Sequence, residues 1–208
     1  MRWSDTGYLI SISSIKENTS ILKIFSENYG CYSGLFFGSS SKKKKPDLQL
    51  GNKIKVHYNS KSEDRIGYFS IELIANTSIK FFNENIKLNL LLTSLEVISK
   101  VMPDRQTYKG VFDDFDLFIE KLESDNFKPY LIWEFNFLKK MGYGIDLNET
   151  TLDSKIKDLL LGKNVDFSFD DLKIIFNLNS QMISDGLVDI INISNFKNRL
   201  KILKYLNE

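Results

Sequence analysis

The hydrophobic pattern of the chain changes its period near residue 76, and this change limits the folds open to it. Before that point apolar and polar residues tend to alternate, which is typical of half-buried strands. After it, apolar residues recur every three or four positions, which is typical of amphipathic helices. A run of strands followed by a run of helices indicates an α+β protein. We therefore divide the chain into residues 1–76 and residues 77–208.

Five short strands are expected in residues 1–76, separated by breaks rich in glycine, asparagine and serine. The strictest alternation is in Lys53–Tyr58, where Ile54, Val56 and Tyr58 face one way. Strands at this spacing suggest a small barrel or sandwich, and an OB-fold barrel fits the size. The predicted fold is an N-terminal five-stranded OB-fold barrel followed by an all-α helical domain. The predicted strands cover residues 8–12, 20–25, 31–38, 53–58 and 67–74.

The apolar spacing in residues 77–208 predicts a helical bundle. Pro129 near the start of one segment and Gly142 past its end are the usual markers of a helix. Ser168 and Asp171 have the spacing of a capping box, with Asp in the place of Glu. Trp133 lies among apolar neighbours, so we expect it in the core together with Phe135 and Phe137. The predicted helices cover residues 79–102, 110–123, 129–141, 151–161, 169–184 and 194–206.

The net charge of +1 conceals an asymmetry between the two regions. Residues 1–76 hold 11 Lys and Arg against 7 Asp and Glu, a net charge of +4. The remaining residues hold 17 against 20, a net charge of −3. A basic first region and an acidic second region suggest different partners for each, with a polyanion for the first.

The sequence carries no signature of an enzyme. No Gly-Lys-Ser/Thr follows Gly34 or Gly38, so there is no phosphate-binding loop. His57 is the only histidine, and no nucleophile motif accompanies it. The one cysteine, Cys31, excludes an internal disulfide and a multi-cysteine zinc site, and a lone cysteine is more often a small buried hydrophobe than a nucleophile. We predict a non-enzymatic protein that needs no metal or cofactor.

A metal-dependent nuclease remains as an alternative from another class. Asp113, Asp114 and Asp116 are paired acids of the kind that hold Mg²⁺. On a helix, however, Asp113 and Asp116 fall on the solvated side opposite Phe112 and Phe115, so a surface role is favoured.

The chain also shows no signal peptide and no apolar run long enough to cross a bilayer. We therefore expect a cytoplasmic protein, nucleoid-associated and without a membrane partner.

The first region has the two features of proteins that bind single strands, a basic groove and aromatic platforms. A loop of small residues, Ser39–Ser41, runs into four consecutive lysines. Two further lysines point the same way on the strand that follows. Phe36 and Tyr68 are further candidates for stacking on bases, although some of these aromatic residues must lie in the core. The expected DNA-binding residues are Lys42, Lys43, Lys44, Lys45, Lys53, Lys55, Arg65, Tyr32 and Tyr58.

The order of residues adds a resemblance to these features. Four segments resemble the opening of the bacterial RecO family: Trp3–Ser11, Asn18–Gly30, Tyr32–Leu35 and Gly38–Lys42. Leu48–Gly51 and Glu63–Gly67 are similar to the turns that precede its fourth and fifth strands. The most specific match is Tyr130–Leu147. The resemblance covers residues 1–147 well and the rest weakly.

The resemblance implies a mediator of DNA repair and recombination. RecO-like proteins have an N-terminal OB fold and a C-terminal helical domain, and they bind single- and double-stranded DNA. They anneal complementary strands, engage the single-strand-binding protein SSB and the partner RecR, and with RecR help to load RecA on SSB-coated DNA. They consume no ATP. A generic single-stranded nucleic-acid-binding protein without mediator activity is the alternative.

Two features of the second region bear on what the resemblance implies. Some family members hold zinc through four cysteines after the segment that ends here at Leu147. Asn148–Lys155 contains no cysteine and is shortened, so no zinc site is expected. SSB ends in an acidic, apolar tail, whose binding site should combine an apolar pocket with nearby cations. The residues expected to supply this charge are Lys197, Arg199, Lys201 and Lys204.

Overall fold

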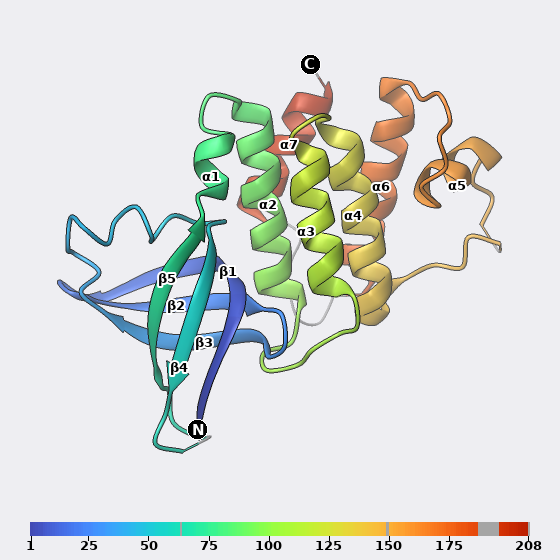
Figure 1. Ribbon diagram of the computed structural model, residues 1–208. Helices are drawn as coiled ribbons and strands as arrows, with labels where there is room; N and C mark the ends of the chain where they lie inside the picture. Colours follow the sequence, from blue (N-terminus) through green and yellow to red (C-terminus); the bar gives the residue numbers. More distant parts are fainter. Residues whose placement is uncertain (63, 149, 187–195, 208) are drawn as a thin grey trace. The chain divides into compact units, whose positions relative to one another are not determined.

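A computed structural model describes residues 1–62, 64–148, 150–186 and 196–207 of the chain (Figure 1). It divides into two compact units, Met1–Phe112 and Asp113–Glu208. The first unit continues beyond residue 76 because helix α2 (Asn85–Val101) packs on strands of the sheet. The switch from strands to helices and the end of the first unit are therefore different positions in the chain. The division into functional domains at residue 76 stays a prediction.

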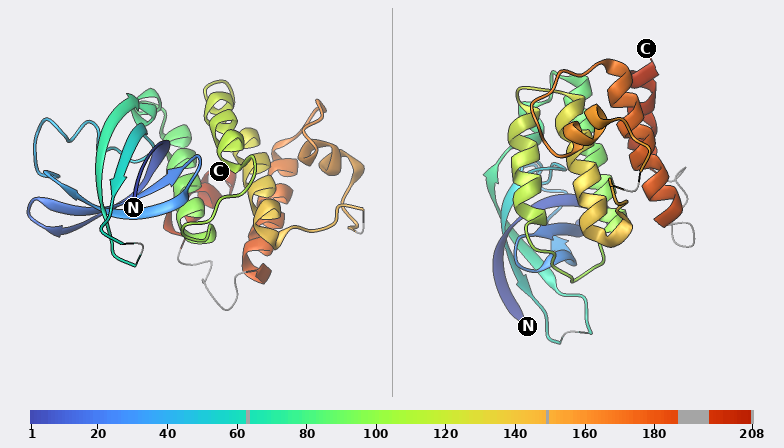
Figure 2. Two further views of the ribbon diagram at one scale, coloured as in Figure 1. Left: turned by 60° about the horizontal axis from the view of Figure 1, so that its bottom comes forward. Right: turned by 90° about the vertical axis from the view of Figure 1, so that its right-hand side faces the viewer.

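The first unit is built on a closed five-stranded barrel (Figure 2). The strands follow each other around the barrel in the order β1-β2-β3-β5-β4. All neighbours are antiparallel except β3 and β5, which run parallel where Leu35 pairs with Tyr68. This is the predicted five-stranded barrel followed by helices. The strands are β1 (Arg2–Lys16), β2 (Thr19–Ser26), β3 (Gly30–Phe37), β4 (Lys53–Asn59) and β5 (Tyr68–Ala75).

The first strand is longer than predicted because it serves two neighbours. Its first half pairs with β4 and its second half pairs with β2. At Gly7, where the two pairings meet, a Cβ atom would lie 2.7 Å from Ile24 Cγ2 and 2.8 Å from the Phe25 carbonyl oxygen. Only glycine allows this close approach. A register shift between Leu9 and Ser11 follows, and such bulges bend a strand. These two features let β1 close the barrel.

Aromatic side chains fill the barrel. The Trp3 ring stacks on Tyr29 at a centroid distance of 4.3 Å and on Tyr58 at 5.1 Å. Ile54, Val56 and Tyr58 point inward together, which confirms the alternation predicted for this strand. The barrel core consists of Trp3, Leu9, Leu22, Ile24, Tyr32, Phe36, Ile54, Val56, Tyr58, Phe69 and Ile71.

The single helix predicted over residues 79–102 is two helices. A short α1 (Thr77–Lys80) is followed by turns, and α2 begins at Asn85. In the break the Phe81 side chain is buried, whereas the neighbouring Phe82 is 71% exposed. The end of α2 agrees with the prediction from Pro103, because a residue before proline is driven out of the helical region. Met102 accordingly has an extended backbone, with ψ 125.

The second unit is centred on α4 (Phe127–Leu138), which packs against α6 (Phe169–Gly186) and α5 (Ser154–Leu160). Trp133, Phe135 and Phe137 are buried, as predicted. The Trp133 ring stacks on Phe118 of α3 (Val111–Leu122), with centroids 5.2 Å apart. α7 (Lys197–Asn207) ends the described chain, and residues 194 and 195 of the expected last helix lie outside the described residues.

Local sequence signals explain two helix boundaries in this unit. After α4 the chain continues in a π-helical turn, Lys139–Tyr143, which turns out of the helix where Gly142 adopts φ 91. At the start of α6 the Asp171 carboxylate accepts from the Ser168 backbone N–H at 2.6 Å, and the Ser168 hydroxyl accepts from the Asp171 N–H at 3.2 Å. This confirms the predicted capping box. The hydrogen bonds from Lys155 and Ser168 hold the pKa of the Asp171 carboxyl at about 2.

Candidate nucleic-acid interface

The lysine-rich loop between β3 and β4 is held at several points along its length. At its start, Asn18 Oδ1 accepts from the Ser40 hydroxyl at 2.7 Å. In its middle, the Lys45 N–H donates to the Ser41 carbonyl at 3.2 Å, which closes a tight turn. At its end, buried Asn52 donates to the Pro46 carbonyl at 2.9 Å. These bonds hold the backbone of the loop that carries the four lysines.

The four lysines of this loop reach solvent. Lys42, Lys43 and Lys45 are exposed, and Lys44 is half-buried with its Nζ 3.7 Å from Asp47. Arg65, in the turn between β4 and β5, is also exposed. Because these charges lie in water, they can approach phosphates without the cost of burial.

The two lysines of β4 share the outer face of the barrel, as the alternation predicted, but they differ in exposure. Lys55 is exposed and pairs in register with Glu72 of β5. Lys53 is half-buried, because its Nζ lies over the Tyr8 ring at 5.5 Å and over the Phe112 ring at 5.6 Å. Lys55 is therefore the better placed of the two to meet a phosphate.

Two aromatic residues predicted to stack on bases lie in the barrel core instead. Tyr32 is 5% exposed and Tyr58 is 3% exposed. The Tyr58 hydroxyl accepts from the Gly67 backbone N–H at 2.9 Å, inside the barrel. Their placement in the DNA-contacting set was wrong, because the interior of a small barrel is filled by large side chains. Phe36 is buried for the same reason.

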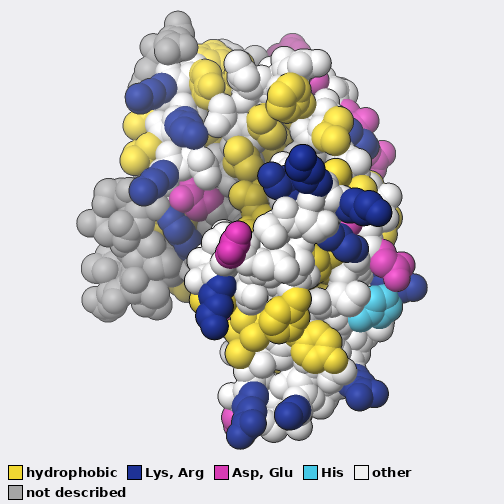
Figure 3. All heavy atoms as spheres, turned by 90° about the vertical axis from the view of Figure 1, so that its left-hand side faces the viewer, with side chains coloured by type: hydrophobic (Ala, Val, Ile, Leu, Met, Phe, Trp, Pro, Cys, Tyr) yellow, Lys and Arg dark blue, Asp and Glu magenta, His cyan; other side chains and the backbone are white. Residues whose placement is uncertain are grey.

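The exposed aromatic residues of the barrel are Phe37 and Tyr68. Phe37 is 59% exposed and Tyr68 is 46% exposed, and their ring centroids lie 6.4 Å apart. On the face shown in Figure 3, hydrophobic side chains gather in the lower part with Lys and Arg side chains around them. Tyr68 was among the sequence candidates, whereas Phe37 was missed. Its signal was the Phe36–Phe37 pair, since two adjacent strand residues face opposite sides.

The histidine and one acid of the Asp113–Asp116 cluster both contact neighbouring side chains. His57 Nδ1 lies 2.6 Å from Ser4 Oγ, and its Nε2 lies 3.7 Å from Glu72. Asp114 accepts from Lys140 Nζ at 2.7 Å, so this member of the acidic cluster is paired. Among the described residues no group of three or more His, Cys, Asp and Glu could hold a metal ion. Nor is any helix of the described chain long and apolar enough to cross a membrane.

Cys31 lies fully buried on β3, and burial raises the pKa of its thiol to about 12. Because only the thiolate reacts, we expect no labelling of the folded protein by a disulfide reagent at pH 8. In guanidinium chloride one thiol per chain should react within minutes. Stoichiometric labelling of protein that keeps its native circular dichroism would contradict the buried placement.

The lysines expected to meet an acidic tail lie on α7 and differ in their surroundings. Lys197, Lys201 and Lys204 are exposed. Arg199 is 3% exposed, and its Nε donates to Glu134 Oε1 at 2.8 Å. Its assignment to a peptide-binding surface was wrong, because the guanidinium is already neutralised inside the unit. This pairing could not be predicted from the sequence, since Glu134 is 65 residues away.

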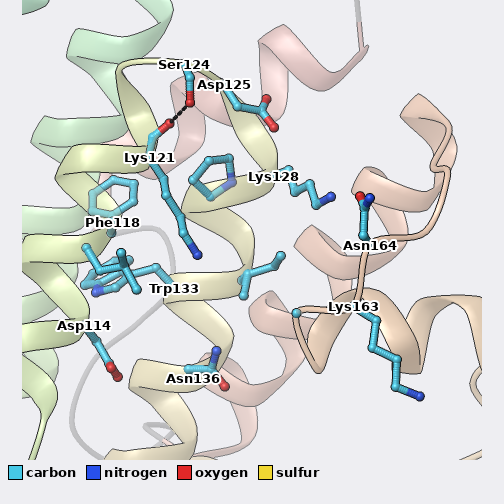
Figure 4. A pocket seen from close by; sticks show the side chains of 14 residues that line it. Asp114, Phe118, Lys121, Ser124, Asp125, Lys128, Trp133, Asn136, Lys163 and Asn164 are labelled. Atoms are coloured by element: carbon cyan, nitrogen blue, oxygen red, sulfur yellow. Dashed lines mark hydrogen bonds between the residues drawn. The ribbon is translucent and has the colours of Figure 1, made fainter.

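A groove of about 380 Å³ opens between α3 and α4 of the second unit (Figure 4). Its apolar wall includes Phe118, Ile132 and Trp133. Lys121 from α3 and Lys128 from α4 extend into its opening, as Figure 4 shows. The groove thus combines an apolar surface with two cations, and sequence reasoning did not identify it.

Comparison with known proteins assigns both parts of the chain. The family model described as "Recombination protein O N terminal" matches residues 1–77, and "Recombination protein O C terminal" matches residues 86–158. A DNA repair protein RecO from Ruegeria sp. (strain TM1040) is 27% identical over 161 residues, which are 76% of this chain and 67% of that protein.

Two further relatives give the same result. The DNA repair protein RecO of Ehrlichia chaffeensis is 28% identical over 76% of this chain and 66% of its own length. That of Caulobacter vibrioides (strain NA1000 / CB15N) is 27% identical over 77% of this chain and 67% of its own. The chain thus spans about two thirds of the length of the curated relatives it matches. With an OB-type barrel and a helical unit matched in order by the two family models, the chain belongs to the RecO family of DNA repair proteins.

Proposed function

We propose that this protein is a recombination mediator in DNA repair, which binds DNA, anneals complementary single strands and helps RecR to load RecA on SSB-coated DNA. The observation that carries the proposal is the ordered loop that presents Lys42–Lys45 on the barrel, within the part matched by the RecO N-terminal model. The protein is proposed to act without catalysis, in the cytoplasm at the nucleoid, where its DNA partner lies.

Charge neutralisation explains how such a surface assists annealing. Two single strands repel each other through their phosphates. Lysines that neutralise phosphates release condensed counterions and reduce this repulsion. The Lys42–Lys45 loop, Lys55 and Arg65 supply separate cations on one barrel. A strand bound there meets its complement with less repulsion, which accelerates pairing without a chemical step.

The groove between α3 and α4 is the proposed binding site for the SSB tail. The tail is acidic and apolar, and the groove offers the complement of both properties. Of the two acids at its rim, Asp114 is paired with Lys140, and Asp125 Oδ1 accepts from the Asn126 N–H at 2.6 Å. Lys163 at the rim is paired with Asp158 at 2.6 Å. Asp125 keeps its charge, so Lys121 and Lys128 together supply a net charge of +1 for the tail, and the Lys128 Nζ lies over the Phe167 ring at 4.7 Å. Exposed Lys197, Lys201 and Lys204 on α7 are a second, less enclosed cationic surface.

Annealing of two complementary oligonucleotides, naked or precoated with the cognate SSB, tests this function. We expect the protein to accelerate duplex formation on both substrates. The variant Lys121→Glu/Lys128→Glu should keep the acceleration on naked strands and lose it on coated strands, because a like charge repels the acidic tail.

Three other results of the annealing experiment would contradict this function or part of it. Acceleration by the wild type on naked strands alone would mean that it does not engage SSB. Binding without acceleration on either substrate would support the alternative, a plain single-strand binder. Degradation of the strands on addition of Mg²⁺ would indicate the nuclease alternative.

A further inference from the structure

Phe37 and Tyr68 are placed as a platform that is open to solvent. Phe37 ends β3 and Tyr68 begins β5, next to the single bridge that joins these strands. Their rings are tilted by 53° to each other at a centroid distance of 6.4 Å. Aromatic side chains in a barrel gain by pointing inward, as Tyr32, Tyr58 and Phe69 do here. Two neighbouring rings that point outward therefore suggest a partner for their faces.

A hollow of about 380 Å³ lies beside the platform, on the outer face of β1, β4 and β5. Tyr68 lines it, and the Tyr68 hydroxyl accepts from Asn59 Nδ2 at 2.9 Å, which fixes the ring. Arg2 and His57 line the rest together with the hydroxyls of Ser4 and Ser70. The volume lies within the range of about 300–1,000 Å³ that is usual for small-molecule sites. Buried Trp3 and Tyr58 also belong to the lining, so the hollow combines aromatic residues, one guanidinium and several hydrogen-bonding groups.

Two loops place charged residues near Phe37 and Tyr68. The loop that carries Lys42–Lys45 begins directly after Phe37. The turn that leads into Tyr68 carries exposed Lys61 and Arg65, but its sequence also holds two acids, Glu63 and Asp64, so its charges cancel. Lys55, on the same outer face as His57, is balanced in part by Glu72. The excess of positive charge beside the platform therefore comes from the Lys42–Lys45 loop, and it favours a polyanion that also carries flat rings.

We propose that Phe37 and Tyr68 form a stacking platform for the unpaired bases of a single strand, and that the hollow bounded by Arg2, His57 and Tyr68 holds an adjacent nucleotide. The inference rests on the proposed function, because it requires the barrel to bind DNA. It adds what the lysines do not provide, a means to distinguish a single strand from a duplex. Bases in a duplex already stack on each other, so their faces are not available to protein rings.

Binding measured by fluorescence anisotropy on three labelled ligands tests the platform. The ligands are an oligo(dT) of about 16 nucleotides, the upper end of an OB-fold site, a strand of abasic residues with equally many phosphates, and a duplex of that length. The variant Phe37→Ala/Tyr68→Ala should bind oligo(dT) about tenfold more weakly or worse, since it removes the rings on which unpaired bases stack. Its affinity for the abasic strand and the duplex should stay within about twofold, and its salt slope should not change, since no charge is removed.

Two control variants accompany the measurement. Phe82→Ala removes another highly exposed ring of the same unit and should leave oligo(dT) binding unchanged. Phe37→Tyr/Tyr68→Phe keeps both rings and should retain most of the affinity. All variants should melt close to the wild type, because neither platform ring belongs to the buried core of the barrel.

The outcomes separate the platform from the proposed function. If the alanine variant binds oligo(dT) as the wild type does, or weakens on all three ligands alike, the platform is wrong although DNA binding stands. If the wild type binds none of the three ligands, the proposed function itself is wrong and the platform with it.

Discussion

Replacement of Arg199 by Met is expected to lower the free energy of unfolding of the second unit by about 3–5 kcal/mol, because it leaves a buried carboxylate without its cation. Arg199 and Glu134 are 4% and 0% exposed at their side chains. Besides Nε to Oε1 at 2.8 Å, the guanidinium donates to Glu134 Oε2 at 3.3 Å, to the Ser180 hydroxyl at 2.8 Å and to the Phe176 carbonyl at 3.2 Å. One side chain of α7 thereby fastens this helix to α4 and α6.

The carboxylate of Glu134 has two further donors. The Tyr130 hydroxyl donates to Oε1 at 2.7 Å, and Asn179 Nδ2 donates to Oε2 at 3.0 Å. After removal of Arg199 these neutral donors remain, but the negative charge stays buried. Uncompensated burial of a charge is what makes the loss of one partner costly.

Urea unfolding followed by circular dichroism at 222 nm measures the effect. The matched control is Lys201→Met, which removes a cation from the same helix at an exposed position and should change the stability by less than about 0.5 kcal/mol. The double variant Glu134→Gln/Arg199→Met, which removes both charges, should be more stable than Arg199→Met alone. Equal stability of Arg199→Met and Lys201→Met would show that the pair contributes nothing.

The stability contributed by Arg199, Glu134 and Tyr130 is expected to depend on pH only in the alkaline range. Burial alone would lower the pKa of Arg199, but the carboxylate of Glu134 raises it above its ordinary value, so the ion pair persists through neutral pH. Burial, and next the charge of Glu134, raise the pKa of Tyr130 well above its usual value. A raised tyrosine pKa keeps the hydroxyl neutral in the folded state, while the unfolded chain ionises near pH 10. The stability that this network contributes should therefore be constant at neutral pH and fall above about pH 10.

The sequence predicted those features of the fold that depend on neighbouring residues. Alternation located β4, and the three- and four-residue spacing located α3 and α6 to within a few residues. The aromatic core of α4 and the capping box at Ser168 followed from equally local patterns. The extent of β1 did not, because its two pairings depend on strands that follow much later in the chain.

Only part of the candidate site could be predicted from the sequence. An exposed basic loop can be recognised from its composition, but whether a ring or a guanidinium is buried depends on partners distant in sequence. Tyr58 follows the inward alternation of its strand, and this signal should have placed it in the core. Arg199 meets Glu134 only through the packing of α7 on the rest of its unit. The Phe36–Phe37 pair indicated that one of the two rings faces outward but not which one, and the α3–α4 groove becomes recognisable only when the surface is known.

Replacement of Lys42, Lys43, Lys44 and Lys45 together by Ala is expected to weaken single-strand binding on the order of 10²-fold near physiological salt. Each phosphate contact to a single strand contributes about 0.7 to the slope of log K against log salt, so the loss of four contacts lowers the slope by about 2.8. The melting temperature should change little, since three of these side chains are exposed and the only described pairing of the fourth, with Asp47, is long at 3.7 Å.

Two matched variants separate local contacts from overall charge. Replacement of the same four residues by Arg keeps the charge and should keep both the affinity and the salt slope. Replacement of four exposed lysines elsewhere, Lys109, Lys139, Lys201 and Lys204, by Ala changes the net charge equally and should leave the slope within about one unit of the wild type. If that control loses as much slope as the loop variant, binding follows the overall charge and not the loop. An unchanged slope in the loop variant itself would place the phosphate contacts on Lys55, Lys61 and Arg65 alone, and the ordered turn at Ser41–Lys45 would then need another explanation.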